Sequence, residues 1–112
     1  MNNNDIEIAK KNIVERFPKI LRGDVQKIYL YGSCARGDYG NDSDVDVAIL
    51  TKCSRDDAKK YDNELMDVVT DIAMKSDAIV EYICIPYEEY LEKKDWYGYF
   101  KNIERDGLAI YG

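Results

Sequence analysis

The stretch that decides the fold spans residues 29–50 and reads YLYGSCARGDYGNDSDVDVAIL. It opens inside a β-branched and aromatic run, Lys27–Tyr31, which is broken by Gly32-Ser33. A segment dense in turn formers, 37–42, follows, and apolar residues then alternate with Asp and Ala over 44–49. Short runs of this kind predict strands, and a Ser directly after a strand-ending Gly can cap a helical turn. The stretch therefore predicts strand, turn, short helix, loop and strand, in that order.

Two acidic residues in this stretch have a spacing that suits a metal ion. Asp44 and Asp46 are two residues apart on the second predicted strand, so both carboxylates point to one face, while Val45 and Val47 point to the other. Like charges held side by side are costly unless a cation lies between them. Mg²⁺ typically takes one or two carboxylates and leaves its other positions to substrate phosphates. The pair therefore indicates a candidate Mg²⁺ site.

The turn between the two strands has the features of a phosphate-binding site. Free backbone N–H groups at a helix N-terminus can bind a phosphate, and Gly32 lets the phosphate approach the backbone. The Ser33 hydroxyl adds a donor, and Arg36 adds a fixed charge one turn later. A phosphate cradle beside a Mg²⁺ pair suits a nucleoside triphosphate and favours two-metal phosphoryl or nucleotidyl transfer.

Simpler interpretations of each element stay open. A lone Asp-x-Asp is usually a solvated strand end, and Arg36 alone can be a surface residue or a partner of Asp38. Asp42-x-Asp44-x-Asp46 also resembles the start of a calcium loop, but that loop needs Gly after the third acid and Glu at its twelfth position. Those positions hold Val47 and Cys53, so the calcium-loop hypothesis fails.

The rest of the chain predicts an α/β domain with a small sheet covered by helices. Apolar spacing predicts a first helix from Ile6 to Ile20, whose last turn is disturbed by Pro18, and a long helix from Arg55 to Ser76. Ile79–Ile85 reads as a third strand stopped by Pro86. The remaining predicted segments are short helices over 87–94 and 100–105 and a short closing segment over 108–111.

Composition limits the chemistry further. The 112 residues allow one domain, 1–112, and the absence of histidine excludes histidine-based triads, bases and metal sites. The formal charge of −6 argues against bulk nucleic-acid binding, and the short apolar runs predict no membrane span. The three cysteines are odd in number and widely spaced, which favours a reducing, cytoplasmic setting, with Cys53 and Cys84 as core or near-core residues.

Taken together, these residues resemble a known signature. Gly32-Ser33, ten residues and then Asp44-x-Asp46 resemble the Gly-Ser/Asp-x-Asp motif of the polymerase-beta nucleotidyltransferase superfamily. The fuller strings over 31–37 and 43–46, with the closing segment 102–111, are similar to its smallest branch, the minimal nucleotidyltransferases of the MNT type. This resemblance implies a single small nucleotidyltransferase domain with a short mixed β-sheet covered by helices.

The resemblance also implies roles for individual residues. Asp44 and Asp46 would bind Mg²⁺, and Gly32-Ser33 would hold the triphosphate, with Arg36 assisting. Members of the family use a third carboxylate on a neighbouring strand, often an Asp. Glu81 is the only acid in the matching strand here, so we expect it to be the third metal ligand or the base for the incoming hydroxyl. A solvent-facing role for Glu81 stays open; Asp67 and Asp71 are weaker candidates because they lie in a helical pattern.

Minimal nucleotidyltransferases resemble the antitoxins of HEPN/MNT toxin–antitoxin modules. The resemblance implies transfer of AMP from ATP to a tyrosine hydroxyl of a HEPN-domain ribonuclease toxin, with a homo-dimer or a hetero-oligomer as the assembly. Eight of the thirteen aromatic residues lie in the last 31 positions, which is typical of a protein interface but also of a tyrosine-rich core edge. Two alternatives are a non-catalytic antitoxin that neutralises the toxin by direct binding and a small-molecule nucleotidyltransferase.

Overall fold

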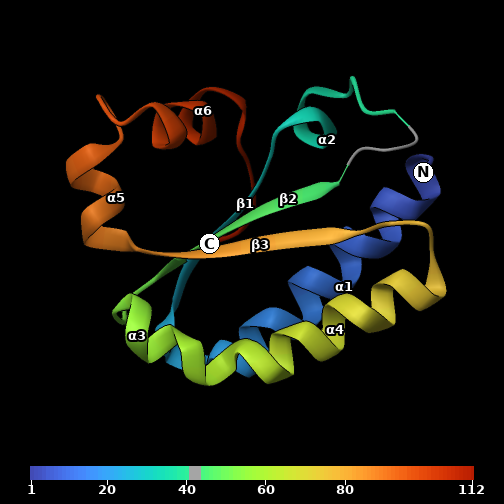
Figure 1. Ribbon diagram of the computed structural model, residues 1–112, viewed down its shortest axis with the longest axis horizontal. Coiled ribbons are helices and arrows are strands. Elements are labelled where there is room, and N and C mark those ends of the chain that lie inside the picture. Colours follow the sequence, from blue (N-terminus) through green and yellow to red (C-terminus); the bar gives the residue numbers. More distant parts are fainter. Residues whose placement is uncertain (41–43) are drawn as a thin grey trace.

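The computed structural model describes residues 1–40 and 44–112 and is built around a four-stranded sheet (Figure 1). Its strands are β1 Val25–Tyr31, β2 Val45–Thr51, β3 Val80–Pro86 and β4 Leu108–Tyr111. Their spatial order is β3-β2-β1-β4. Strand β1 runs antiparallel to both β2 and β4, whereas β2 runs parallel to β3. The predicted mixed sheet is therefore confirmed.

Strand β4 lies where the sequence predicts only a short closing segment. It pairs with β1 through Tyr29↔Ala109 and Leu30↔Leu108. Three of its four residues are exposed, so burial imposes no alternation of apolar and polar residues on the segment. Its pairing partner lies almost eighty residues earlier in the chain, where local sequence patterns cannot reveal it.

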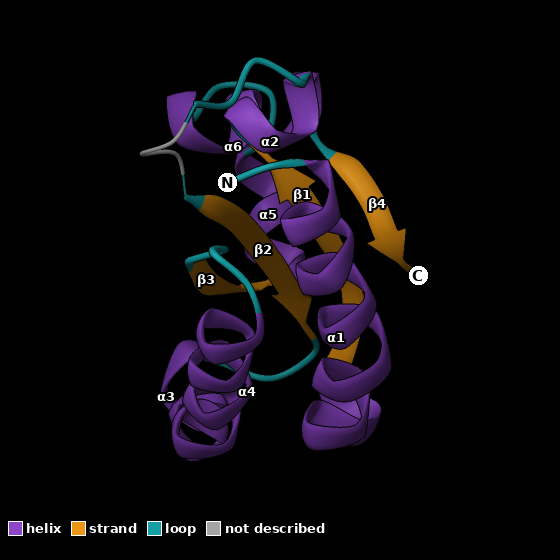
Figure 2. Cartoon of the chain, turned by 90° about the vertical axis from the view of Figure 1, so that its right-hand side faces the viewer, coloured by secondary structure: helices purple, strands orange, loops and turns teal. Residues whose placement is uncertain are grey.

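Helices cover both faces of the sheet. Within the described residues they are α1 Asn3–Leu21, α2 Ser33–Arg36, α3 Arg55–Ala58, α4 Asp62–Lys75, α5 Tyr87–Lys93 and α6 Gly98–Asp106. Helices α1 and α4 pack side by side on one face, and α5 and α6 lie on the other (Figures 1 and 2). None of these helices combines the length and the apolar character that crossing a bilayer requires.

Two predicted helices differ in detail from those observed. The helix expected over 55–76 is divided, because a 3₁₀ turn over 59–61 separates α3 from α4. That turn brings Tyr61 to Asp24, to which its hydroxyl donates a hydrogen bond. Helix α1 continues past Pro18 to Leu21, since the buried side chains on either side of the proline, Phe17 and Leu21, hold the last turn against the core.

Strand β2 is buried on both faces along most of its length. On the α1/α4 face, Val45, Val47 and Ile49 are fully buried. On the opposite face, Ala48 and Leu50 are fully buried in a second cluster with residues of α5 and α6. Only Asp46, at the start of this second face, keeps partial contact with solvent. The carboxylates therefore lie where the α5/α6 layer ends and the sheet opens to solvent.

Candidate active site

Three neighbouring strands place polar side chains in one row across the sheet. Asp46 on β2 is opposite Tyr31 on β1 and opposite Glu81 on β3. Asp44 lies one residue before β2 begins. Because residues in register across a sheet project to the same face, the side chains of the row are neighbours. The predicted candidates Asp44, Asp46 and Glu81 are therefore brought together from segments up to 37 positions apart. We call these three carboxylates the acidic row.

The three carboxylates repel one another in the absence of a cation. Burial, followed by the charge of Asp44, raises the pKa of Asp46 above its usual value. The pKa of Glu81 is also raised, first by the charge of Asp44 and then by a side-chain hydrogen bond with it, with smaller effects of burial and of Asp46. Raised pKa values on converging acids indicate a site that a cation would stabilise.

The carboxylate oxygens of Asp44, Asp46 and Glu81 are chemically suited to bind Mg²⁺. Carboxylate oxygens are the ligands that this ion prefers, and it commonly keeps positions for water and substrate phosphate. Within 1–40 and 44–112, no three acidic or thiol side chains form a closed cluster around a single point. Asp44 and Asp46, with Glu81 beside them, are the residues that could hold the ion in an open site.

Gly32 joins the turn at Gly32-Ser33 to the carboxylates. It is the N-cap of α2 and has φ +74°, a value that side chains rarely adopt. A Cβ atom at this position would lie 2.7 Å from the Oδ2 atom of Asp46. Only glycine satisfies both conditions, so the turn and Asp46 are packed directly together. A triphosphate held at this turn would lie beside the carboxylates.

Helix α2 is short and is tied to the start of β2. The amides of Ala35 and Arg36 donate to the Gly32 carbonyl, which leaves the earlier amides at the helix N-terminus, where Ser33 begins the first turn. The buried Cys34 thiol donates to the Asp44 carbonyl at 3.4 Å. Cys34 therefore fixes the distance between the turn and the acidic pair, a role that no local sequence signal indicated.

Arg36 is held by two carboxylates. Its Nε donates to Asp38 at 3.2 Å, and its Nη1 donates to Asp106 of α6 at 3.0 Å. The Asp106 side chain is only 10% exposed and also pairs with Arg105. The pair with Asp38 was one of the simpler interpretations, whereas the pair with Asp106 was not foreseen. The predicted role of Arg36 in binding phosphate stays a prediction.

Sequence reasoning also missed the aromatic border of the site. The Tyr31 and Tyr99 hydroxyls are hydrogen bonded, and their rings meet edge to face with centroids 5.9 Å apart. Burial is the largest cause that raises the pKa of Tyr31, with Asp46 and Glu81 adding smaller contributions. Helix α6 thus closes one side of the acidic row. The alternation of Tyr29 and Tyr31 on β1 was the only available signal.

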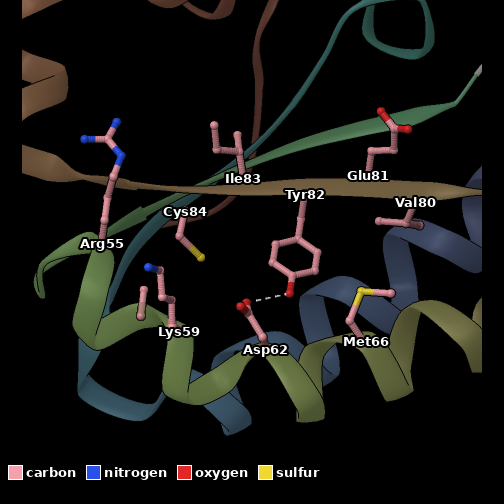
Figure 3. A pocket seen from close by; sticks show the side chains of 10 residues that line it. Arg55, Lys59, Asp62, Met66, Val80, Glu81, Tyr82, Ile83 and Cys84 are labelled. Carbon is pink, nitrogen blue, oxygen red and sulfur yellow. Dashed lines mark hydrogen bonds between the residues drawn. The ribbon is translucent and has the colours of Figure 1, made fainter.

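The weaker acidic candidates lie on the opposite face. Asp71 of α4 is paired with Arg16 and Lys75, and its pKa is lowered, first by the hydrogen bond from Lys75. Asp67 lies on the same helix and lines a shallow cavity between α1 and α4. Both residues belong to α4, and Glu81 points to the side of β3 that faces away from α4 (Figure 3). Of the motif residues named above, Asp42 and Ser43 lie outside the described residues.

A cavity of about 650 Å³ adjoins the site along β3 (Figure 3). Glu81 and Ile83 point to the side of the acidic row, whereas Tyr82 and Cys84 point toward α3 and α4. The Tyr82 hydroxyl donates to Asp62 at 2.8 Å. Burial is the main cause that raises the pKa of Cys84 to about 12, so its thiol stays protonated and fills space, as predicted.

The sequence matches a known domain over most of its length, in agreement with this geometry. Residues 7–105 match the nucleotidyltransferase domain. The chain belongs to the nucleotidyltransferase domain family. The protein is therefore an enzyme, a nucleotidyltransferase, and the fold expected from its Gly-Ser and Asp-x-Asp motifs is confirmed.

Individual relatives agree with this family. The nucleotidyltransferase is 30% identical over 105 residues to a protein of Methanocaldococcus jannaschii named "Putative protein adenylyltransferase MJ0604", a match that covers 94% of this chain and 97% of that protein. All of this chain also superposes on 74% of a chain in two toxin–antitoxin crystal structures. One is a mutant MntA-HpeT, with a TM-score of 0.57 and 19% identity, and the other contains AMP-PNP, with a TM-score of 0.55 and 20% identity. At these identities the likeness concerns the fold alone.

Proposed function

We propose that this nucleotidyltransferase is an antitoxin that transfers AMP from ATP to a tyrosine hydroxyl of a HEPN-domain ribonuclease toxin. The observation that carries the proposal is the acidic row Asp44, Asp46 and Glu81, with Gly32 packed against Asp46. The adenylyltransferase name of the relative of similar length, and the toxin–antitoxin assemblies that share the fold, support the nature of the reaction and of the partner.

Each residue of the site has a part in this reaction. Asp44 and Asp46 would hold Mg²⁺, which when bound neutralises charge on the triphosphate and orients its phosphates. The turn at Gly32-Ser33 offers amide and hydroxyl donors to the β- and γ-phosphates. Arg36 lies one turn further on, where its guanidinium can add a positive charge once the phosphates compete with Asp38 and Asp106.

The transfer of AMP to the tyrosine needs one bond to form, one bond to break and a group that accepts the proton. The tyrosine oxygen forms a bond to the α-phosphorus of ATP, and the bond from that phosphorus to the bridging oxygen breaks. Pyrophosphate leaves with the electron pair of that bond. The proton of the tyrosine hydroxyl passes to the carboxylate of Glu81, which is in register with Asp46 across the sheet.

The proposal is tested by label transfer from ATP labelled at the α-phosphate to a HEPN-domain ribonuclease that co-purifies with this chain. We expect labelled toxin with the wild-type chain and Mg²⁺, and no label with the Asp44→Asn, Asp46→Asn double variant. Asp67→Asn is the matched control, because it removes a carboxylate from the opposite face and should leave transfer unchanged. Absence of label with the wild-type chain would refute the proposal.

Neutralisation of the toxin by binding alone is the second candidate. It is favoured by three exposed aromatic side chains at the N-terminal end of α6, which are of the type enriched at protein interfaces: Trp96, Tyr97 and Tyr99. The double variant separates the two functions. If cells that carry the toxin survive equally well with the double variant and with the wild type, binding alone is sufficient and transfer is not required.

A further inference from the structure

The outer edge of β3 leads directly away from the acidic row. Strand β3 is the last strand of the sheet and, among the described residues, pairs only with β2. Its second residue, Glu81, belongs to the acidic row. Edge strands present unpaired main-chain groups that readily accept another extended segment. The reacting centre and an open strand edge are therefore parts of one continuous surface.

The side chains along this edge suit an extended segment of another protein. The cavity of about 650 Å³ runs beside β3 from Val80 to Cys84. Exposed apolar side chains border the edge: Ile79 is 50% exposed, Ile83 is 36% exposed and Met66 of α4 is 50% exposed. An apolar surface next to unpaired main chain is typical of sites where a peptide adds a strand to a sheet.

Charge differs between the two ends of the cavity. Glu81 lies at one end, beside Asp44 and Asp46, and Arg55 and Lys59 lie at the other, beside Cys84 (Figure 3). Arg55 also pairs with Glu89 and Lys59 with Asp56, but the two basic side chains stay 49% and 72% exposed to an incoming segment. An occupant with a neutral hydroxyl at the acidic end and an acidic side chain at the basic end would complement this arrangement. The polarity gives an extended segment a preferred direction along β3.

Resting on the function proposed above, we propose that the edge of β3 is the docking site of the acceptor. An extended segment of the partner protein pairs its main chain with β3, and the residue opposite Glu81 carries the accepting hydroxyl. Directly opposed residues on paired strands project to the same face, with Cβ atoms roughly 4.5–5.5 Å apart. The hydroxyl is thereby placed on the same face as Glu81 and Asp46.

A second copy of this chain is a less suitable occupant. Antiparallel pairing of two β3 strands would place a residue of β3 opposite Glu81 in each copy, whereas the proposed function requires an acceptor hydroxyl of the toxin at that position.

The test combines hydrogen exchange with kinetics, using a HEPN-domain ribonuclease that co-purifies with this chain as the toxin. Hydrogen exchange is measured with an α,β-methylene ATP analogue, which cannot transfer AMP, and kcat and KM are measured with ATP. We expect the main-chain amides of 80–85 that face away from β2 to become protected when the toxin is added. Ile83→Lys and Met66→Lys should each raise KM for the toxin at least about tenfold, with kcat and nucleotide affinity unchanged. Met74→Lys is the matched control, because Met74 is also on α4 but is 83% exposed and absent from the cavity. Thermal unfolding of each variant checks that it folds.

The outcomes separate this inference from the proposed function. If the wild type transfers label but all three lysine variants behave alike, or if toxin binds without protecting these amides of 80–85, the docking inference is overturned and the function stands. If these amides are protected by the toxin but the wild type transfers no label, the docking site stands and the function is overturned. Protection of these amides in the absence of toxin, together with a dimer in sedimentation, assigns the edge to a second copy and overturns the inference.

Discussion

Substitution of Gly32 by alanine perturbs the contact between the turn at Gly32-Ser33 and the acidic row. Gly32 has φ +74° and ψ −154°, a region that is essentially restricted to glycine, so a side chain there costs about 1–3 kcal/mol. In addition, the new Cβ would lie 2.7 Å from Asp46 Oδ2. Ordinary van der Waals contact begins at 3.4 Å. The carboxylate must therefore move by 3.4 − 2.7 = 0.7 Å, or rotate away from its partners.

A displacement of this size acts on the reaction more than on the fold. A misplacement of about 1 Å at a catalytic centre can cost about 10²-fold in rate. For Gly32→Ala we therefore expect a loss of about 10–100-fold in label transfer, in addition to a lower unfolding temperature. Transfer is measured well below the unfolding temperature, so that the folded fraction does not limit the rate.

Gly37 supplies the matched control. It also has a positive φ, +83°, but a Cβ at Gly37 would meet no atom within 4 Å. Gly37→Ala should therefore lower stability by about 1 kcal/mol and reduce transfer far less than Gly32→Ala does. Equal losses of transfer in the two variants would refute the reasoning, because backbone strain alone would then explain the effect and contact with Asp46 would be irrelevant.

Three further variants test the electrostatics of the site. Because the pKa of Asp46 is raised, the folded chain holds that proton to a higher pH than the unfolded chain, and stability falls as pH rises above the usual carboxyl range. Asp46→Asn should therefore raise the metal-free unfolding temperature at pH 7 by about 2–4 °C, and calorimetry that shows a decrease would contradict this. Mg²⁺ at ten times its Kd should stabilise the wild type by about 1.4 kcal/mol and the variant less. Glu81→Gln should lower transfer about 10²-fold or more and abolish the acid limb of the rate profile, and a profile like that of the wild type would remove Glu81 as the base. Asp106→Asn removes a carboxylate that competes with the phosphates for Arg36 and should lower KM for ATP about fivefold with little change in kcat, whereas an unchanged or higher KM would contradict this competition.

Helices and strands could be predicted where burial of one face makes apolar residues recur at regular spacing in the sequence. Val45, Val47 and Ile49 alternate because one face of β2 lies on α1 and α4. Gly32 and the acidic pair were found for a similar reason, because a sharp turn and a pair of like charges each need particular residues at fixed spacing. Strand β4 was missed because its mostly exposed residues carry no such constraint.

The border of the candidate site depends on contacts that are distant in the sequence, and this is why it could not be predicted. Arg36 meets Asp106 and Tyr31 meets Tyr99, at separations of 70 and 68 residues. Both contacts bring α6 to the edge of the acidic row, and both depend on the way Phe100 and Ile103 bury α6 against the sheet. No residue of α6 carries a motif for nucleotide chemistry, yet α6 holds the one arginine of the turn and closes one side of the carboxylates. A change in the packing of α6 therefore reaches Arg36 and Tyr31 together, and a partner that contacts the exposed aromatic residues beside α6 would act on the nucleotide site through these same two contacts.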